Sequence, residues 1–141
     1  ILPRIIQIFA GRNGAITSET RTTKMGYEYR PEAVIYNLRR LNNIFPDKEI
    51  FITENGIATD NDDERIEFVT TVLQDVHRFQ AEHNNVIGYL YWSLLDNFEW
   101  DLGYQMNFGL VEVDKETYER IPHKSASWFG NISSSNVLSI K

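Results

Sequence analysis

Two short apolar runs stand out along the chain, and polar residues follow each of them. The first run covers residues 50–53 and is followed by Glu54 and an Asn-Gly turn. The second run covers residues 86–95, and an acidic stretch that includes Glu99 comes next. Runs that are apolar on both faces are typical of buried parallel strands. Because a charged group at the end of a buried strand is costly unless it is used, the first carboxylate is a candidate for chemistry.

Apolar residues at helical spacing predict two longer helices, one before each strand. The first helix is expected at residues 31–45, with Pro31 in the first turn, and the second at about residues 63–83. Asp62 or Asp63 is the expected N-cap of the second helix. Residues 5–9 are a possible further strand, and residues 11–24 read as a polar loop.

The segment after the second strand predicts smaller elements. Residues 110–113 and 118–121 flank a four-residue polar turn and are expected to form a hairpin. Residues 124–129 are expected to form a short last helix, and the serine-rich tail from Ser133 is expected to fray.

The order helix, strand, helix, strand, helix indicates parallel βα units and an α/β fold. Two strands cannot close a barrel, and an eight-stranded βα barrel takes about 250 residues. Either the 141 residues form a small two-stranded α/β domain, or they form the last part of a (β/α)8 barrel. We favour the second interpretation.

Composition excludes several function classes. The net charge is −6 and no basic run occurs, which argues against a nucleic-acid partner. There is no cysteine, and the three histidines lack the spacing of metal ligands. No Gly-rich phosphate-binding loop occurs either, so neither a metal nor a cofactor is expected. No apolar run approaches the roughly 20 residues of a membrane span, so no membrane partner is expected.

Glu54 and Glu99 over a barrel mouth suggest glycoside hydrolysis, in which two carboxylates flank the bond that breaks. The alternative is that each is a solvated loop charge or a helix cap. Trp92 and Trp100 lie near Glu99 in the sequence and suit stacking on the apolar faces of sugar rings. Phe98 and Tyr104 are expected in the core. Asp96, Asn97 and Asp101 could bind sugar hydroxyls or cap loops, and we favour structural roles for them.

Two motifs carry a resemblance to a known family. Ile-Thr-Glu-Asn-Gly at residues 52–56 and Trp-Ser-Leu-Leu-Asp-Asn-Phe-Glu-Trp at residues 92–100 resemble glycoside hydrolase family 1. This is the β-glucosidase and β-galactosidase family of retaining (β/α)8 barrels. Further stretches agree in order at residues 25–32, 63–66, 108–110 and 124–129. The resemblance covers residues 25–131, with residues 1–24 as a loop-rich lead-in and 132–141 as a tail of one barrel domain.

The resemblance implies a role for each candidate residue. Glu54 matches the nucleophile that forms the covalent glycosyl-enzyme. Glu99 matches a carboxylate that binds sugar hydroxyls, Trp92 the platform under the sugar, and Trp100 an indole whose N–H reaches a hydroxyl. Phe108 is expected to line the same pocket. The intact Glu-Trp pair and the lack of a nearby phosphate-binding lysine imply an unphosphorylated glycone, although glucose, galactose, fucose and mannose all stay open.

The sequence also departs from the family. Tyr27 replaces a usual Trp, Val72 a frequent His, and Asn107 a usual Arg, which puts the packing of the last loop in doubt. The Asn-Glu-Pro motif of the acid/base is absent. The resemblance therefore implies strands seven and eight of the barrel, with the acid/base in an N-terminal part outside this chain and with little activity in this chain alone. The rival is a non-catalytic carbohydrate-binding or structural fragment.

Overall fold

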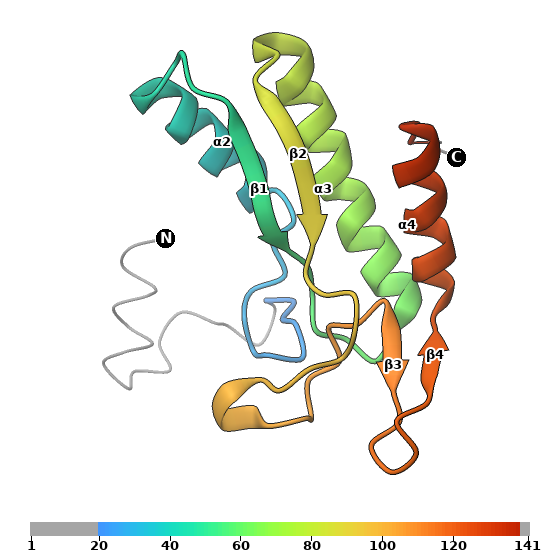
Figure 1. Cartoon of the computed structure of the whole chain (residues 1–141). Coiled ribbons are helices and arrows are strands. Elements are labelled where there is room, and N and C mark those ends of the chain that lie inside the picture. Colours follow the sequence, from blue (N-terminus) through green and yellow to red (C-terminus); the bar gives the residue numbers. More distant parts are fainter. Residues whose placement is uncertain (1–19, 139–141) are drawn as a thin grey trace.

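The computed structural model describes residues 20–138, which form two parallel strands, a row of helices and a small hairpin (Figure 1). The predicted strand at residues 5–9 lies outside the described residues. The elements are α2 (Ala33–Ile44), β1 (Ile50–Asn55), α3 (Asp62–His83), β2 (Val86–Tyr91), the 3-10 helix η1 (Trp100–Leu102), β3 (Val111–Val113), β4 (Arg120–Pro122) and α4 (Lys124–Ser135).

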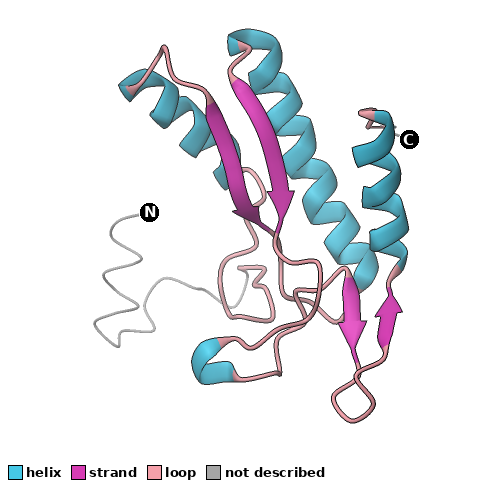
Figure 2. Cartoon of the chain, viewed as in Figure 1, coloured by secondary structure: helices cyan, strands magenta, loops and turns pink. Residues whose placement is uncertain are grey.

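β1 and β2 lie side by side and run in the same direction, as predicted (Figures 1 and 2). Ile50 is paired with Val86 at one end of the ladder and Asn55 with Tyr91 at the other. Both strands therefore end at the same edge. The loops that follow them gather beyond this edge.

The second strand ends at Tyr91, so its predicted extension to residue 95 is wrong. Beyond the strand the backbone turns to other partners: Ser93 N donates to Phe108 O at 3.3 Å, and Val111 N donates to Leu94 O at 2.9 Å. An apolar run cannot reveal this change because its residues stay apolar after the strand pairing ends.

The helices bury one face of the two strands. Val72 and Phe79 of α3 are fully buried, and Leu38 of α2 packs against Phe79. Ile50 and Ile52 of β1 pack on the same cluster. The strands are not buried on both faces, however. The apolar side chains of β1 and β2 that stay about half exposed are Phe51 (48%), Ile87 (60%) and Leu90 (51%).

The N-cap of α3 is neither Asp62 nor Asp63, so that prediction is wrong. Asn61 is the N-cap, because its side-chain oxygen accepts a hydrogen bond from Asp63 N at 3.1 Å. Asp62 instead joins the start of α3 to the start of α4. Its carboxylate accepts from Ser125 N at 2.8 Å, from Ser125 Oγ at 2.6 Å and from Arg65 Nη1 at 2.5 Å.

The C-terminal region follows the predicted order, but its helix is longer. β3 and β4 pair antiparallel, which confirms the hairpin. α4 runs to Ser135, so the expected fraying from Ser133 is wrong. Ser134 Oγ and Ser135 Oγ donate to the carbonyls of Gly130 and Asn131 at 2.8 and 2.7 Å, and these bonds fit serine into the last turn.

Gly56 follows β1 where the chain passes very close to Trp92. A Cβ atom on Gly56 would lie 1.8 Å from Trp92 O and 2.9 Å from Trp92 C. Since both atoms belong to the backbone, no side-chain rotation relieves the overlap. Glycine is required here by the close approach of two chain segments.

Asp62→Asn is expected to destabilise the protein at pH 7 by about 2 kcal/mol, because it weakens charge-assisted hydrogen bonds. Burial works to raise the pKa of Asp62, but the hydrogen bonds from Ser125 and Arg65 outweigh it and hold that pKa below its ordinary 3.8. The native carboxylate therefore stabilises the fold above that ordinary value, and this stabilisation is lost as pH falls through the lower folded-state pKa. Urea unfolding from pH 7 down to pH 3 measures both effects.

The matched control for this substitution is Asp63→Asn, which removes an exposed carboxylate that pairs with Lys124. It should change the unfolding free energy by less than about 1 kcal/mol. Equal losses for the two variants, or a loss for Asp62→Asn that does not shrink in acid, would contradict the assignment.

Gly56→Ala is expected to lower the unfolding free energy by about 3 kcal/mol or more, because the new methyl group meets backbone atoms. Gly130→Ala is the control. A Cβ on Gly130 meets nothing within 4 Å, so this change inside α4 should stabilise the protein by up to about 1 kcal/mol. Thermal unfolding of both variants tests this prediction. A Gly56→Ala protein as stable as the native one would contradict the close approach of Gly56 to Trp92.

Candidate active site

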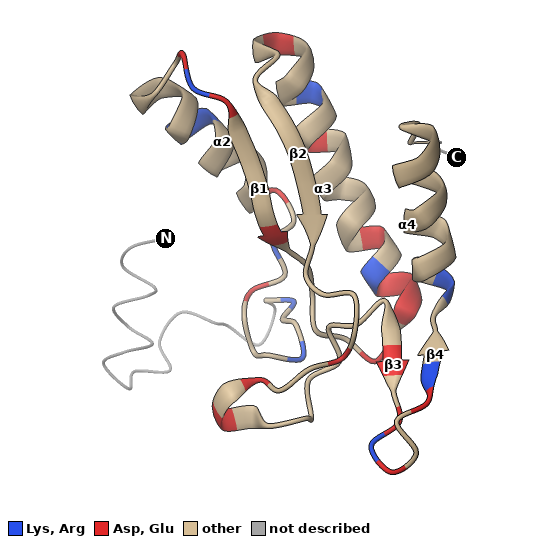
Figure 3. Ribbon diagram, viewed as in Figure 1, with Lys and Arg blue, Asp and Glu red and all other residues tan. Residues whose placement is uncertain are grey.

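The predicted nucleophile stands at the strand edge where the loops gather. Glu54 is the last residue but one of β1, and its side chain is exposed. It is the acidic position at the carboxyl end of that strand (Figure 3). Among residues 20–138, no hydrogen bond or ion pair holds the Glu54 carboxylate. A carboxylate that is free of protein partners is available to a ligand.

Trp92 lies beside the end of β1 that carries Glu54. Trp92 N donates to Asn55 O at 2.9 Å, which continues the pairing of the two strands by one residue. The Trp92 side chain is 39% exposed. The structure therefore brings the ends that carry Glu54 and Trp92 together, as the sequence predicted.

Two tyrosines of β2 bond to residues around the site, and neither was among the predicted site residues. Tyr89 Oη donates to Asn55 Oδ1 at 2.9 Å, and Tyr91 Oη donates to Phe108 O at 2.9 Å. Burial raises the pKa of Tyr91 to about 12 and that of Tyr89 further, so both hydroxyls stay protonated and donate near neutral pH. Their spacing of two residues in an apolar strand was the available signal, since a buried tyrosine hydroxyl usually has a partner.

Phe108 contacts the residues around the site through its backbone carbonyl. Its carbonyl accepts from Tyr91 Oη and from Ser93 N, so the last part of the loop is tied directly behind Trp92. Asp96 accepts from Gly109 N at 2.8 Å, and Asn97 donates to Ser93 Oγ at 2.8 Å. The structural roles predicted for Asp96 and Asn97 are confirmed.

Asn107 departs from the family's usual Arg, yet its loop is well anchored. Asn107 Oδ1 accepts from Lys24 Nζ at 2.7 Å, and Lys24 also pairs with Asp60 at 2.5 Å. The Asn107 carbonyl accepts from Thr59 N at 3.1 Å and from Arg65 Nη2 at 3.0 Å. The doubt about local packing is therefore resolved: a lysine from the lead-in segment supplies the positive charge at this loop.

Glu99 and Trp100 are not brought into contact with the other predicted site residues. They lie at the start of η1, on a loop that reaches away from the strand ends (Figure 1). Trp100 is 81% exposed. In the described part of the chain, neither side chain makes a hydrogen bond or ring contact with Glu54 or Trp92.

Phe98 and Tyr104 are not core residues, so that prediction is wrong. Their rings meet edge to face with centroids 5.2 Å apart, and they are 57% and 59% exposed. The two rings pack on each other across the η1 turn and not against the helices. An aromatic pair of this kind buries part of its surface locally without reaching the main core.

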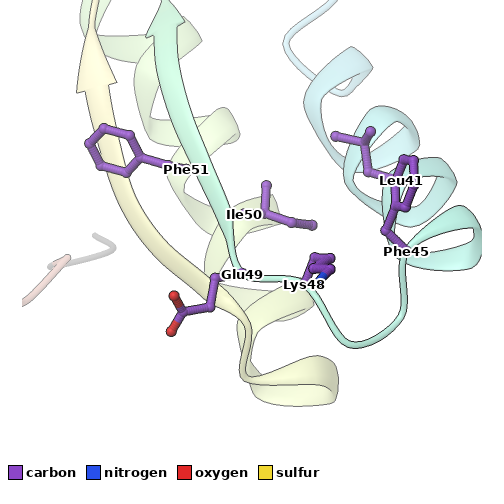
Figure 4. A pocket seen from close by; sticks show the side chains of 6 residues that line it. All are labelled: Leu41, Phe45, Lys48, Glu49, Ile50 and Phe51. Atoms are coloured by element: carbon purple, nitrogen blue, oxygen red, sulfur yellow. The ribbon is translucent and has the colours of Figure 1, made fainter.

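A hollow of about 240 Å³ lies elsewhere (Figure 4). It is formed where the end of α2 meets the start of β1, and it is lined by Leu41, Phe45, Lys48, Glu49, Ile50 and Phe51. This is the amino end of β1, opposite the end that carries Glu54, so it is not the candidate active site.

The described residues contain no group of side chains arranged to hold a metal ion. None of the described helices is long and apolar enough to cross a bilayer.

Comparison with known proteins identifies the family. A sequence profile described as glycosyl hydrolase family 1 matches residues 8–138. A bifunctional beta-D-glucosidase/beta-D-fucosidase of Bifidobacterium breve is 39% identical over 120 residues, which are 76% of this chain and 26% of the relative. Beta-glucosidase A of Thermotoga maritima is 36% identical over 125 residues, which are 82% of this chain and 28% of that enzyme.

Solved structures agree with these relatives. The family 1 β-glucosidase from Thermotoga maritima superposes with a TM-score of 0.83 at 34% identity, over 88% of this chain and 31% of that one. The family 1 β-glucosidase from Exiguobacterium antarcticum gives 0.78 at 40% identity, over 84% and 28%. The chain thus spans about a quarter to a third of the length of these relatives. The described residues form a partial α/β piece that matches part of these structures, and not a closed barrel. The resemblance seen in the two motifs is confirmed, and the chain belongs to glycosyl hydrolase family 1.

Proposed function

We propose that this chain carries the nucleophile of a retaining β-glycosidase that hydrolyses unphosphorylated β-D-glucosides or related β-glycosides. One observation carries the proposal. The parallel pairing of β1 and β2 puts the Glu54 carboxylate, which has no partner among residues 20–138, at the strand edge where Trp92 is bonded to Asn55. In βα barrels this edge is where chemistry takes place.

Glu54 acts by covalent catalysis. A Glu54 carboxylate oxygen attacks the anomeric carbon while the bond to the aglycone oxygen breaks, and an acid outside these 141 residues protonates that oxygen. The same outside group then removes a proton from water, which attacks the anomeric carbon and releases Glu54. The chain's own contribution is the nucleophile and part of the sugar pocket, without a cofactor or metal.

The pocket residues are assigned from the family resemblance and from their loop. Trp92 is the platform under the sugar ring, and Phe108 lines the pocket behind it. Glu99 and Trp100 lie on the loop between Trp92 and Phe108, and they bind hydroxyls of the glycone. Relatives named as β-glucosidases support this reading, as do Thermotoga maritima structures in complex with isofagomine lactam and cyclophellitol.

We further propose that β1 and β2 take the places of strands seven and eight in a (β/α)8 barrel whose remaining strands complete the fold. Phe51, Ile87 and Leu90 support this proposal, because parallel strands are normally covered on both faces and these side chains are exposed. The relatives are longer than this chain, and their additional residues are of the right kind to cover this strand face. The partner is the N-terminal part of the same enzyme.

A non-catalytic carbohydrate-binding fragment remains the second candidate, and one observation favours it. The 141 residues contain no Asn-Glu-Pro motif, so this chain brings no acid/base of its own. Assembly of the 141 residues with the N-terminal barrel part discriminates the two functions. Release of the aryl group from an aryl β-glucoside supports the enzyme, whereas binding without release supports the fragment.

Glu54→Gln in the assembled enzyme is expected to reduce turnover of an aryl β-glucoside by at least about 10⁴-fold, because an amide does not form the covalent intermediate. Glu116→Gln removes an exposed carboxylate in the β3–β4 turn and should leave turnover unchanged. Steady-state kinetics measure both variants. Unchanged turnover in Glu54→Gln would mean that the nucleophile is wrongly assigned.

Leu90→Asp is expected to weaken assembly with the N-terminal part at least about tenfold, because it puts a charge on the face that this part should cover. Tyr118→Asp is the control, since Tyr118 is also an exposed large side chain (66%, against 51% for Leu90) but lies in the hairpin turn. Co-purification of the separately expressed parts measures assembly. If both variants assemble like the native chain, the face has another role.

A further inference from the structure

Arg65 is the largest fully buried side chain of the described residues, with 1% exposure. It lies in the first turn of α3, where the helix dipole disfavours a positive charge. Its Nε atom has no hydrogen-bond partner within residues 20–138. Burying a guanidinium at such a position is costly, so helix stability alone does not explain its place.

The contacts of Arg65 join two loops that are distant in the sequence. Arg65 Nη2 donates to Thr59 O at 3.1 Å and to Asn107 O at 3.0 Å. Thr59 N also donates to Asn107 O at 3.1 Å. One guanidinium nitrogen therefore fastens the loop after β1 to the end of the loop after β2.

Both fastened points lie close to the candidate active site along the chain. Thr59 belongs to the short connection that starts directly after Glu54 and the Asn-Gly turn. Asn107 directly precedes Phe108, whose carbonyl accepts from Ser93 N just behind Trp92. A change in the distance between these loops would move the nucleophile relative to the sugar platform.

The other end of the guanidinium is itself held. Arg65 Nη1 donates to Asp62, and Asp62 also accepts two hydrogen bonds from Ser125 at the start of α4. The fork geometry of arginine suits this arrangement, because one planar group donates to a carboxylate and to two carbonyls at once. A lysine ammonium lacks that geometry.

We propose that Arg65 is a positioning residue of the active site. It fixes the loops after β1 and β2 to each other, so that Glu54 and Trp92 face the same bound sugar. This inference rests on the proposed function, and it assigns Arg65 no contact with substrate. Since small misplacements of reacting groups cost large factors in rate, the loss of this contact should reduce activity in molecules that remain folded.

The test uses Arg65→Met and Arg65→Lys in the enzyme assembled from these 141 residues and the N-terminal part. Arg78→Met is the matched control, because Arg78 is an exposed arginine of the same helix that pairs with Asp75. Three quantities are measured below the unfolding temperature of each variant: kcat, KM, and the rate at which an activated 2-deoxy-2-fluoroglucoside labels Glu54 covalently. Labelling is expressed per folded molecule, so a purely structural loss does not change it.

Both Arg65 variants are expected to lose about tenfold or more in kcat/KM and in labelling rate, while Arg78→Met stays within about twofold of the native enzyme. Folded Arg65 variants that label Glu54 at the native rate overturn the proposal. If neither variant folds, Arg65 is a structural residue and the proposal is likewise overturned.

The native enzyme and Glu54→Gln are run beside these variants to keep the two proposals apart. If the native enzyme neither hydrolyses the aryl glucoside nor becomes labelled, the proposed function has failed. If the native enzyme is labelled and Glu54→Gln is not, the function stands and the Arg65 variants alone decide this inference.

Discussion

The hydrogen bond from Trp92 N to Asn55 O is the contact on which the candidate active site depends. It continues the parallel pairing of β1 and β2 past the last residue of β2, and it forces the chain past Gly56 so closely that no Cβ fits there. Trp92 and Glu54 come from different βα units, yet their backbones share this one fixed point. Because strand pairing sets the register, the relative position of the two residues is a property of the backbone and does not depend on their own side chains.

Much of this fold could be predicted from the pattern of apolar residues. The long stripes of α2 and α3 and the two apolar runs are periodic, and a periodic pattern reports which face a segment buries. Boundaries were predicted less well for physical reasons. β2 ends at Tyr91 because Ser93 and Leu94 find backbone partners in the last loop. Asn61 caps α3, while the Asp62 side chain is occupied by Arg65 and Ser125. Such partners are distant in sequence and leave no local signal.

The candidate active site, too, could be predicted from the sequence only in part. Glu54 and Trp92 could be placed from the sequence, since a residue at or directly after the end of a strand has a position fixed by the strand. Glu99 and Trp100 were expected in the same pocket, but η1 holds them on a loop without contact to Glu54 in the described structure. The supports of the site escaped prediction altogether. Tyr89, Tyr91 and Arg65 act on backbone carbonyls or on an amide side chain, and neither kind of partner can be read from a motif.

Polar and apolar interactions are distributed unevenly over this chain, and the distribution has a consequence for assembly. The carboxyl edge of the strands is held by directed contacts, among them those of Arg65 and of Lys24 with Asn107. The strand face that carries Phe51, Ile87 and Leu90 has no such cover from the described residues. Directed hydrogen bonds fix geometry, whereas apolar burial supplies a non-directional driving force. The loops that bear Glu54 and Trp92 can therefore keep their mutual arrangement through contacts within this chain, while in the proposed barrel apolar burial is the force that would drive union with further strands.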